Sequence, residues 1–191
     1  KMKFQKLVDL NGTPTPGFII PEVGDEISIR LPEETSNFPA EDIPIDVLYE
    51  DDDLMFINKQ PGLIVHPTKG HPFHTIANGL MKYMLNNGQK YKIRFANRID
   101  MDTSGIVIVA KNANSQNDIS LQMRENLVHK QYMAIVNGVI RDDEFTIDKP
   151  IGRPNEESIQ RKVLSEGGKD AITDVKVLER FYNNTLVEVT L

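Results

Sequence analysis

The chain has 191 residues, which suits one domain or one domain with part of another, and 39% of its residues are hydrophobic, as in a globular protein. It contains no cysteine and no apolar run near the roughly 18 residues that a membrane span needs. These features exclude a disulfide scaffold, a cysteine nucleophile and a membrane-spanning helix, and they fit a cytoplasmic setting. The net charge of −6 is unusual for a nucleic-acid binder, but the charge is unevenly distributed.

The first 44 residues contain too little for a complete domain. Residues 26–31 alternate between polar and apolar after a turn at residues 24–25, which predicts a strand. Residues 32–44 are rich in proline, glutamate and aspartate, which is typical of a linker. We therefore expect residues 1–31 to be the remnant of a small N-terminal domain and the main domain to occupy residues 45–191.

In the main domain, short alternating or β-branched runs predict strands separated by polar turns. Two segments instead carry apolar residues four apart, which predicts helices. Because strands outnumber helices, we expect an α+β fold with a mixed, largely antiparallel central sheet and a few flanking helices. The strands are expected at residues 47–49, 54–57, 106–110, 131–137, 171–178 and 185–191. One helix is expected to begin at Thr75 and to bury Ile76, Leu80 and Met84; the other is expected to be capped by Asn114 or Ser115 and to bury Ile119, Met123 and Leu127.

A block of positive charge occupies residues 54–99. The segment before it, residues 1–53, has a net charge of −9, and the segment after it, residues 100–191, has a net charge of −4. The block itself holds seven basic residues and no acidic one, so it predicts either a solvated face or a binding surface for a polyanion. The basic residues are Lys59, Lys69, Lys82, Lys90, Lys92, Arg94 and Arg98.

The densest polar cluster lies at residues 97–105, directly before the buried strand expected at residues 106–110. Asp100 and Asp102 are two residues apart and would share a face if the backbone were extended. An ionised aspartate near an arginine such as Arg98 is a candidate nucleophile or general base. The same residue types are common in a turn that leads into a strand, so the cluster predicts either a catalytic loop or a simple turn.

The three histidines of the basic block do not predict a metal site. The spacing of His66, His71 and His74 matches none of the common zinc patterns, and no cysteine is present to complete one. The chain also lacks the glycine pattern of a phosphate-binding loop. We therefore expect neither a metal nor a nucleotide cofactor.

Four segments resemble the motifs of RluA-type pseudouridine synthases, in the same order and spacing. Residues 97–111 are similar to the catalytic motif, His-Arg-Leu-Asp, two variable residues and Thr-Ser-Gly, followed by an apolar strand and Ala-Lys. Residues 57–67 resemble the first motif, residues 130–138 the Lys-x-Tyr strand, and residues 168–173 a Gly-Lys-x-Ala-x-Thr segment. The resemblance covers residues 45–191, and the N-terminal piece resembles the end of a small RNA-binding domain of the ribosomal-protein type.

The resemblance implies an isomerase that converts uridine to pseudouridine in RNA without a cofactor or metal. It assigns the catalytic role to Asp100, as a nucleophile at the sugar or as a base that abstracts a sugar proton. Arg98 matches the arginine that enters the RNA stack, and Tyr132 matches the tyrosine that stacks on the extruded base. The other candidate RNA-binding residues in the matching motifs are Thr103, Ser104, Lys59 and Lys130, of which Thr103 and Ser104 also shape the loop.

The chain departs from the family pattern at two places. Asn97 stands where histidine is commoner, and Ile99 stands where leucine is usual. A later motif, which supplies an arginine that pairs with the catalytic aspartate, is not present before Leu191. We therefore expect the catalytic domain to be C-terminally incomplete. Two outcomes stay open for the 191 residues: RNA binding with turnover, and RNA binding without it.

The resemblance favours ribosomal RNA of the large subunit as the partner, by analogy with relatives that carry the N-terminal RNA-binding domain. Two alternatives remain: the same activity on transfer RNA, and an RNA-binding module without catalysis. Nothing in the sequence calls for a membrane, a metal or a second subunit, so we expect a monomer.

Overall fold

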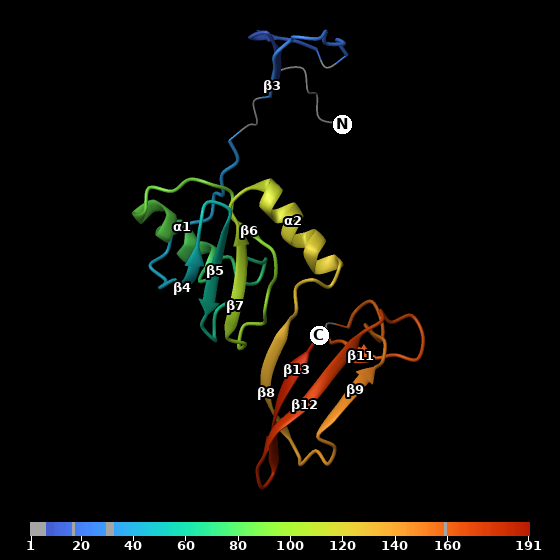
Figure 1. Cartoon of the computed structure of the whole chain (residues 1–191). Coiled ribbons are helices and arrows are strands. Elements are labelled where there is room, and N and C mark those ends of the chain that lie inside the picture. Colours follow the sequence, from blue (N-terminus) through green and yellow to red (C-terminus); the bar gives the residue numbers. More distant parts are fainter. Residues whose placement is uncertain (1–6, 17, 30–32, 159) are drawn as a thin grey trace. The chain divides into compact units, whose positions relative to one another are not determined.

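The computed structural model describes residues 7–16, 18–29, 33–158 and 160–191 (Figure 1). The chain forms two compact units, Lys1–Ser120 and Leu121–Leu191, so the unit boundary falls inside the single catalytic domain expected from the sequence. Each unit contains a four-stranded antiparallel sheet, which confirms the α+β, largely antiparallel fold. Within the described residues, no helix is long and apolar enough to cross a membrane.

The first unit begins with a small antiparallel sheet in the order β2-β1-β3. Its strands are β1 (Val8–Leu10), β2 (Thr13–Pro14) and β3 (Ile27–Ile29). β3 confirms the centre of the strand expected at residues 26–31; Arg30 and Leu31, like Pro32 of the expected linker, lie outside the described residues.

The linker packs against the domain although it has no helix or strand in residues 33–44. Phe38 and Ile45 contact the core cluster, and the side-chain amide of Asn78 donates to the Pro39 carbonyl at 2.9 Å. Gly79 makes this approach possible, because a Cβ there would lie only 2.8 Å from Ile45 Cδ1. The linker therefore packs on the domain through defined contacts from about Phe38 onward.

The main sheet of the first unit has the order β4-β5-β7-β6 and packs on the first helix (Figure 1). The expected strands at residues 47–49, 54–57 and 106–110 are all present. The short β6 was not predicted, because two residues give no periodic signal. The four strands are β4 (Val47–Glu50), β5 (Leu54–Lys59), β6 (Arg94–Phe95) and β7 (Gly105–Ala110).

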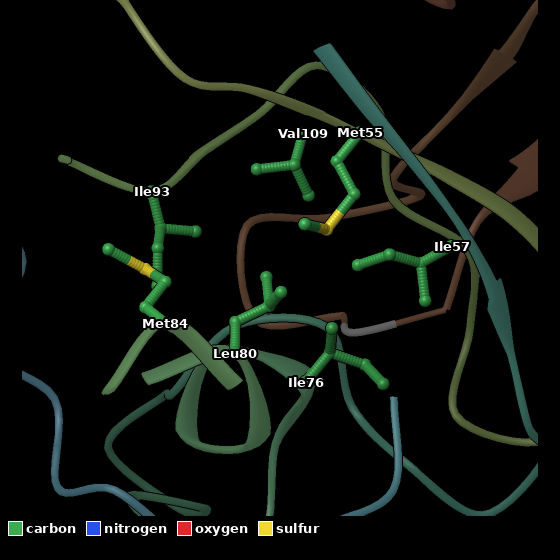
Figure 2. Packing of buried hydrophobic residues seen from close by; sticks show 7 residues of the cluster. All are labelled: Met55, Ile57, Ile76, Leu80, Met84, Ile93 and Val109. Carbon is green, nitrogen blue, oxygen red and sulfur yellow. The ribbon is translucent and has the colours of Figure 1, made fainter. Parts of the chain in front are cut away.

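The core of this unit lies between the sheet and α1 (Ile76–Asn86) (Figure 2). Ile76, Leu80 and Met84 are buried on one face of α1, as the four-residue spacing predicts. Thr75 is the N-cap, also as expected, and its N–H and hydroxyl both donate to Asn78 Oδ1. The strand residues of the same cluster are Met55, Ile57 and Val109, joined by Ile93.

The second helix, α2 (Ala113–Arg124), differs from its prediction at both ends. Its first turn is capped by Asn112, whose side-chain oxygen accepts from the Ser115 N–H at 2.9 Å, and not by Asn114 or Ser115. Asn126 has a φ of 57°, a left-handed conformation that ends the helix, so Leu127 lies beyond the buried face. Ile119 is buried as expected.

The second unit contains a sheet in the order β8-β13-β12-β9. Three of its strands match the expected segments, and β8 does so residue for residue. β9 was missed because four of its five residues are exposed and it lacks a clear apolar alternation. The strands are β8 (Gln131–Asn137), β9 (Glu144–Asp148), β12 (Ile172–Arg180) and β13 (Asn184–Thr190), beside a short pair, β10 (Ile151–Gly152) and β11 (Lys162–Val163).

Glu50, at the end of β4, connects the sheet of the first unit to α1. It accepts hydrogen bonds from the Tyr83 hydroxyl at 2.6 Å and the Gln89 amide at 2.8 Å, and it pairs with the Lys111 ammonium at 2.7 Å. Burial alone would raise the pKa of Glu50, but these three partners outweigh burial and lower that pKa. The hydrogen bond to Glu50 in turn raises the pKa of Tyr83 from its ordinary 10.0 to about 12.

Replacing Leu80 with alanine tests the core. Leu80 is fully buried, so Leu80→Ala should lower the free energy of unfolding by about 2–5 kcal/mol, measured by urea denaturation. Leu85 lies on the same helix and is 64% exposed, so Leu85→Ala should change stability by less than about 0.5 kcal/mol. Equal effects of the two substitutions would contradict the packing of α1.

The Tyr83–Glu50 hydrogen bond predicts a loss of stability in alkali. Between about pH 10 and 12 the folded chain keeps the Tyr83 proton that the unfolded chain releases, so the free energy of unfolding falls as pH rises. Urea denaturation across this range should show a smaller fall for Tyr83→Phe. Tyr182→Phe is the control, because Tyr182 is 94% exposed. If the free energy of unfolding of Tyr83→Phe falls with pH as steeply as that of the wild type, the linkage is refuted.

Candidate active site

The polar cluster forms the loop between β6 and β7, and the Asn97 amide fixes its beginning. Asn97 Nδ2 donates to the Ile106 carbonyl at 3.0 Å, and Asn97 Oδ1 accepts from the Ile108 N–H at 2.8 Å. The side chain thus continues the hydrogen bonding between β6 and β7 by one further step. Sequence reasoning noted Asn97 only as a departure from histidine and missed this role, although an amide is one of the few side chains able to serve both backbone groups.

Asp100 begins a tight turn. The Thr103 N–H donates to the Asp100 carbonyl at 3.2 Å, so Asp100 and Asp102 occupy a turn and not the extended backbone considered from the sequence. Both carboxylates are exposed, as is Ser104, whereas Thr103 is half-buried. Gly105 follows with a φ of 129°, which is accessible to glycine and admits the chain into β7.

Lys59 supports this turn from beneath. Its side chain is fully buried, and its ammonium donates to the carbonyls of Met101 at 2.9 Å, Leu63 at 2.7 Å and Gln60 at 2.9 Å. The Met101 carbonyl also accepts from the Gly62 N–H at 2.8 Å. All three donors of the ammonium are therefore used, and two loops of the chain are tied together at one point.

The position of Lys59 differs from the RNA contact expected from the sequence. An ammonium without exposed surface cannot meet a phosphate, and Lys59 instead holds the turn that carries Asp100. Burial lowers the pKa of Lys59, and the charges of Asp102 and Asp100 oppose this effect. The two carboxylates thus help to keep the buried ammonium charged.

Arg98 is exposed and borders a hollow of about 600 Å³. Among the described residues, its guanidinium has no hydrogen-bond or ion-pair partner, so it is available to a ligand. His66 lies in the same hollow, with its ring edge-on to Phe95 at 6.0 Å and to Phe38 at 5.2 Å. The hollow has a cationic and aromatic lining, which suits nucleic acid. Its lining also includes Lys92, Arg94, Asn97 and Gln116.

Tyr132 and Lys130 belong to the second unit. Tyr132 lies on β8, opposite Val189 of β13, and is half-buried. Lys130 precedes β8 and is exposed, while its carbonyl accepts from the Leu191 N–H at 3.0 Å. The first unit thus brings together Lys59, Arg98, Asp100, Thr103 and Ser104, and the second unit presents Tyr132 and Lys130.

The histidines of the basic block have separate surroundings. His74 Nδ1 contacts Glu41 Oε2 at 2.5 Å, and the backbone of His71 pairs with Thr68. Across the described ranges, no group of three histidine or acidic side chains is placed to hold a metal ion.

Comparison with known proteins identifies a sequence family that matches most of the chain. Residues 53–191 match the sequence family described as RNA pseudouridylate synthase. A Bacillus subtilis protein named uncharacterized RNA pseudouridine synthase YlyB is 38% identical over 96% of this chain. The ribosomal large subunit pseudouridine synthase D of Neisseria meningitidis serogroup B is 36% identical over 86% of this chain.

The same comparisons bear on length and fold. The chain spans 62% of the Bacillus relative and 44% of the Neisseria relative. A solved structure, human RNA pseudouridylate synthase domain containing 1, superposes with a TM-score of 0.64 over 80% of this chain and 61% of its own, at 23% identity. That likeness confirms the fold.

Removing the Lys59 ammonium should loosen the loop. Lys59→Met removes the ammonium donor from the Gln60, Leu63 and Met101 carbonyls, of which Met101 keeps the Gly62 N–H, and we expect the free energy of unfolding to fall by about 2 kcal/mol. Lys69→Met removes the same charge from an exposed position and should change stability by less than about 0.5 kcal/mol. Urea denaturation of both variants decides this, and similar stabilities would disprove the bracing role.

Proposed function

Because this chain belongs to the RNA pseudouridylate synthase family, we propose that it acts in the isomerisation of uridine to pseudouridine in RNA, with Asp100 as the catalytic residue. In this reaction the bond between the ribose and the ring nitrogen breaks. A bond from the ribose to ring carbon 5 forms in its place, the hydrogen on that carbon leaves as a proton, and the freed ring nitrogen gains a proton. The chemistry needs a carboxylate held next to the sugar of an extruded nucleotide.

One observation carries this proposal: an exposed carboxylate stands on a turn whose backbone is braced by a buried ammonium. Asp100 is free to meet a ligand, while Lys59 and the Gly62 N–H hold the Met101 carbonyl beside it. A catalytic group needs such support, because a displacement of about 1 Å can cost a hundredfold in rate.

The other site residues divide the work of extrusion and binding. A stacked base hides its glycosidic bond, so the nucleotide must leave the stack before Asp100 can act. Arg98, exposed two residues before Asp100, is proposed to take the vacated place. Tyr132 is proposed to stack on the extruded base, which is worth about 1–3 kcal/mol. Thr103 and Ser104 shape the turn, and Lys130 is proposed to contact RNA.

We propose large-subunit ribosomal RNA as the substrate and the cytoplasm as the setting. Several bacterial relatives are named ribosomal large subunit pseudouridine synthase D. The proposed organisation remains residues 1–31 from an RNA-binding domain, a linker at 32–44 and a catalytic domain from residue 45. If tritium is released from labelled transfer RNA and not from labelled ribosomal RNA, transfer RNA is the substrate.

Tritium release from RNA that carries uridine labelled at ring carbon 5 tests the activity. We expect Asp100→Asn to lower release by more than about a thousandfold, because the carboxylate performs the chemistry. Asp102→Asn removes a carboxylate from the same exposed turn and should keep release within about tenfold of wild type.

The assay is run on the 191-residue chain and on a C-terminally extended version. Release only from the extended version would identify these residues as an incomplete catalytic domain. If neither version releases tritium from ribosomal or transfer RNA but both bind RNA, the chain is a binding module and not an enzyme.

A further inference from the structure

Acidic side chains of the linker pair with part of the basic block, which contains no acid of its own. Lys90 Nζ lies 2.7 Å from Glu33 Oε2, and Lys92 Nζ lies 3.0 Å from Glu34 Oε1. Arg94 also pairs with Glu34, through Oε2. Three of the seven cations are therefore covered by two carboxylates that lie far away in the sequence.

The covered cations continue the surface that carries Arg98. Basic side chains occur at alternate positions, Lys90, Lys92 and Arg94, and Arg98 follows four residues later. The residues between them, Tyr91, Ile93 and Phe95, pack on the core. Lys90, Lys92 and Arg94 line one hollow together, and Lys92, Arg94 and Arg98 line another, so the four charges lie on one continuous side. The segment thus forms a cationic track, defined here as Lys90, Lys92, Arg94 and Arg98.

Two hollows run along this track. The hollow beside Arg98, of about 600 Å³, and a second one of about 430 Å³ both include Lys92 and Arg94 in their lining. Glu33 and Glu34 are also among the residues that line the second hollow. The carboxylates therefore occupy the end of a surface that begins at the proposed catalytic loop.

We propose that Glu33 and Glu34 occupy the places of RNA phosphates on the cationic track, so that a bound RNA strand displaces this part of the linker. The inference rests on the proposed function and adds to it a competition between linker and substrate. Ammonium and guanidinium groups bind carboxylate and phosphate with the same donors, so one anion can replace the other. Arg94 supports this choice, because its side chain is only 8% exposed and needs an anion in either state.

The contacts of the linker with the cationic track can be broken while the rest of the linker stays packed on the domain. The side chains of Lys90 and Glu33 are 68% and 81% exposed, so solvent screens their attraction. The Ile93 N–H donates to Ser36 Oγ at 2.9 Å, and the contacts of Phe38 with the core follow. Displacement therefore involves residues 33–36, and the linker stays packed on the domain from Phe38 onward.

RNA binding by Glu33→Gln/Glu34→Gln tests the competition. Glutamine keeps the shape and a hydrogen-bond acceptor for Arg94 but removes the charge. We expect this variant to bind a labelled ribosomal RNA fragment about tenfold more tightly than wild type at about 50 mM salt, measured by fluorescence anisotropy. The gain should shrink at about 200 mM salt, because salt already weakens the linker pairs in the wild type.

Glu156→Gln/Glu157→Gln is the matched control. The two residues are exposed and adjacent in the sequence, as Glu33 and Glu34 are, and neither belongs to the proposed RNA-binding surface. This variant changes the net charge by the same amount, so its RNA affinity should rise by less than about twofold. Lys90→Gln should weaken binding more in the Glu33→Gln/Glu34→Gln background than in the wild type, because only there is Lys90 free. Glu33→Gln alone, which leaves the Arg94 pair intact, should give about a threefold gain.

The outcomes separate the two proposals. If no version binds RNA, the proposed function fails. If the wild type binds RNA but Glu33→Gln/Glu34→Gln and Glu33→Gln bind no more tightly than the control variant, the competition is refuted while the function stands. Thermal unfolding of each variant checks that an unchanged affinity does not come from loss of fold.

Discussion

The ammonium of Lys59 has no exposed surface, and three backbone carbonyls surround it. A buried charge is costly unless every donor is used, so its position leaves little freedom to the chain around it. One of those carbonyls belongs to Met101, inside the turn that begins at Asp100. Lys59 therefore links three segments through its hydrogen bonds: the end of β5, the turn after it and the proposed catalytic turn. The exposure of Asp100 is thus compatible with a fixed position.

A second constraint is electrostatic. The basic block and the acidic linker carry opposite charges at different places in the sequence, and folding brings parts of them into contact. The remaining basic residues of the block, Lys69, Lys82 and Arg98, have no ion-pair partner in the part of the chain that the structure describes. The surface that we propose contacts RNA therefore has fewer unpaired cations than the seven basic residues of the block suggest, and displacement of the linker would free three more.

Regular elements with a strong local pattern were predictable. The spacing of Ile76, Leu80 and Met84 identified α1 and its buried face, because a helix places residues four apart on one side. The alternation along residues 131–137 identified β8. The failures occurred where tertiary contacts decide: β6 has two residues, and α2 is capped by Asn112 and ended by the left-handed backbone of Asn126.

The sequence by itself determined the family resemblance, the fold class and the candidate residues from Arg98 to Ser104, because these depend on local order and spacing. It could not determine that Lys59 is buried against the turn at Asp100, or that Glu33 and Glu34 cover Lys90, Lys92 and Arg94. Those facts depend on contacts between segments 40 to 60 residues apart. Only the packing of the strands and the linker brings such segments within hydrogen-bonding distance.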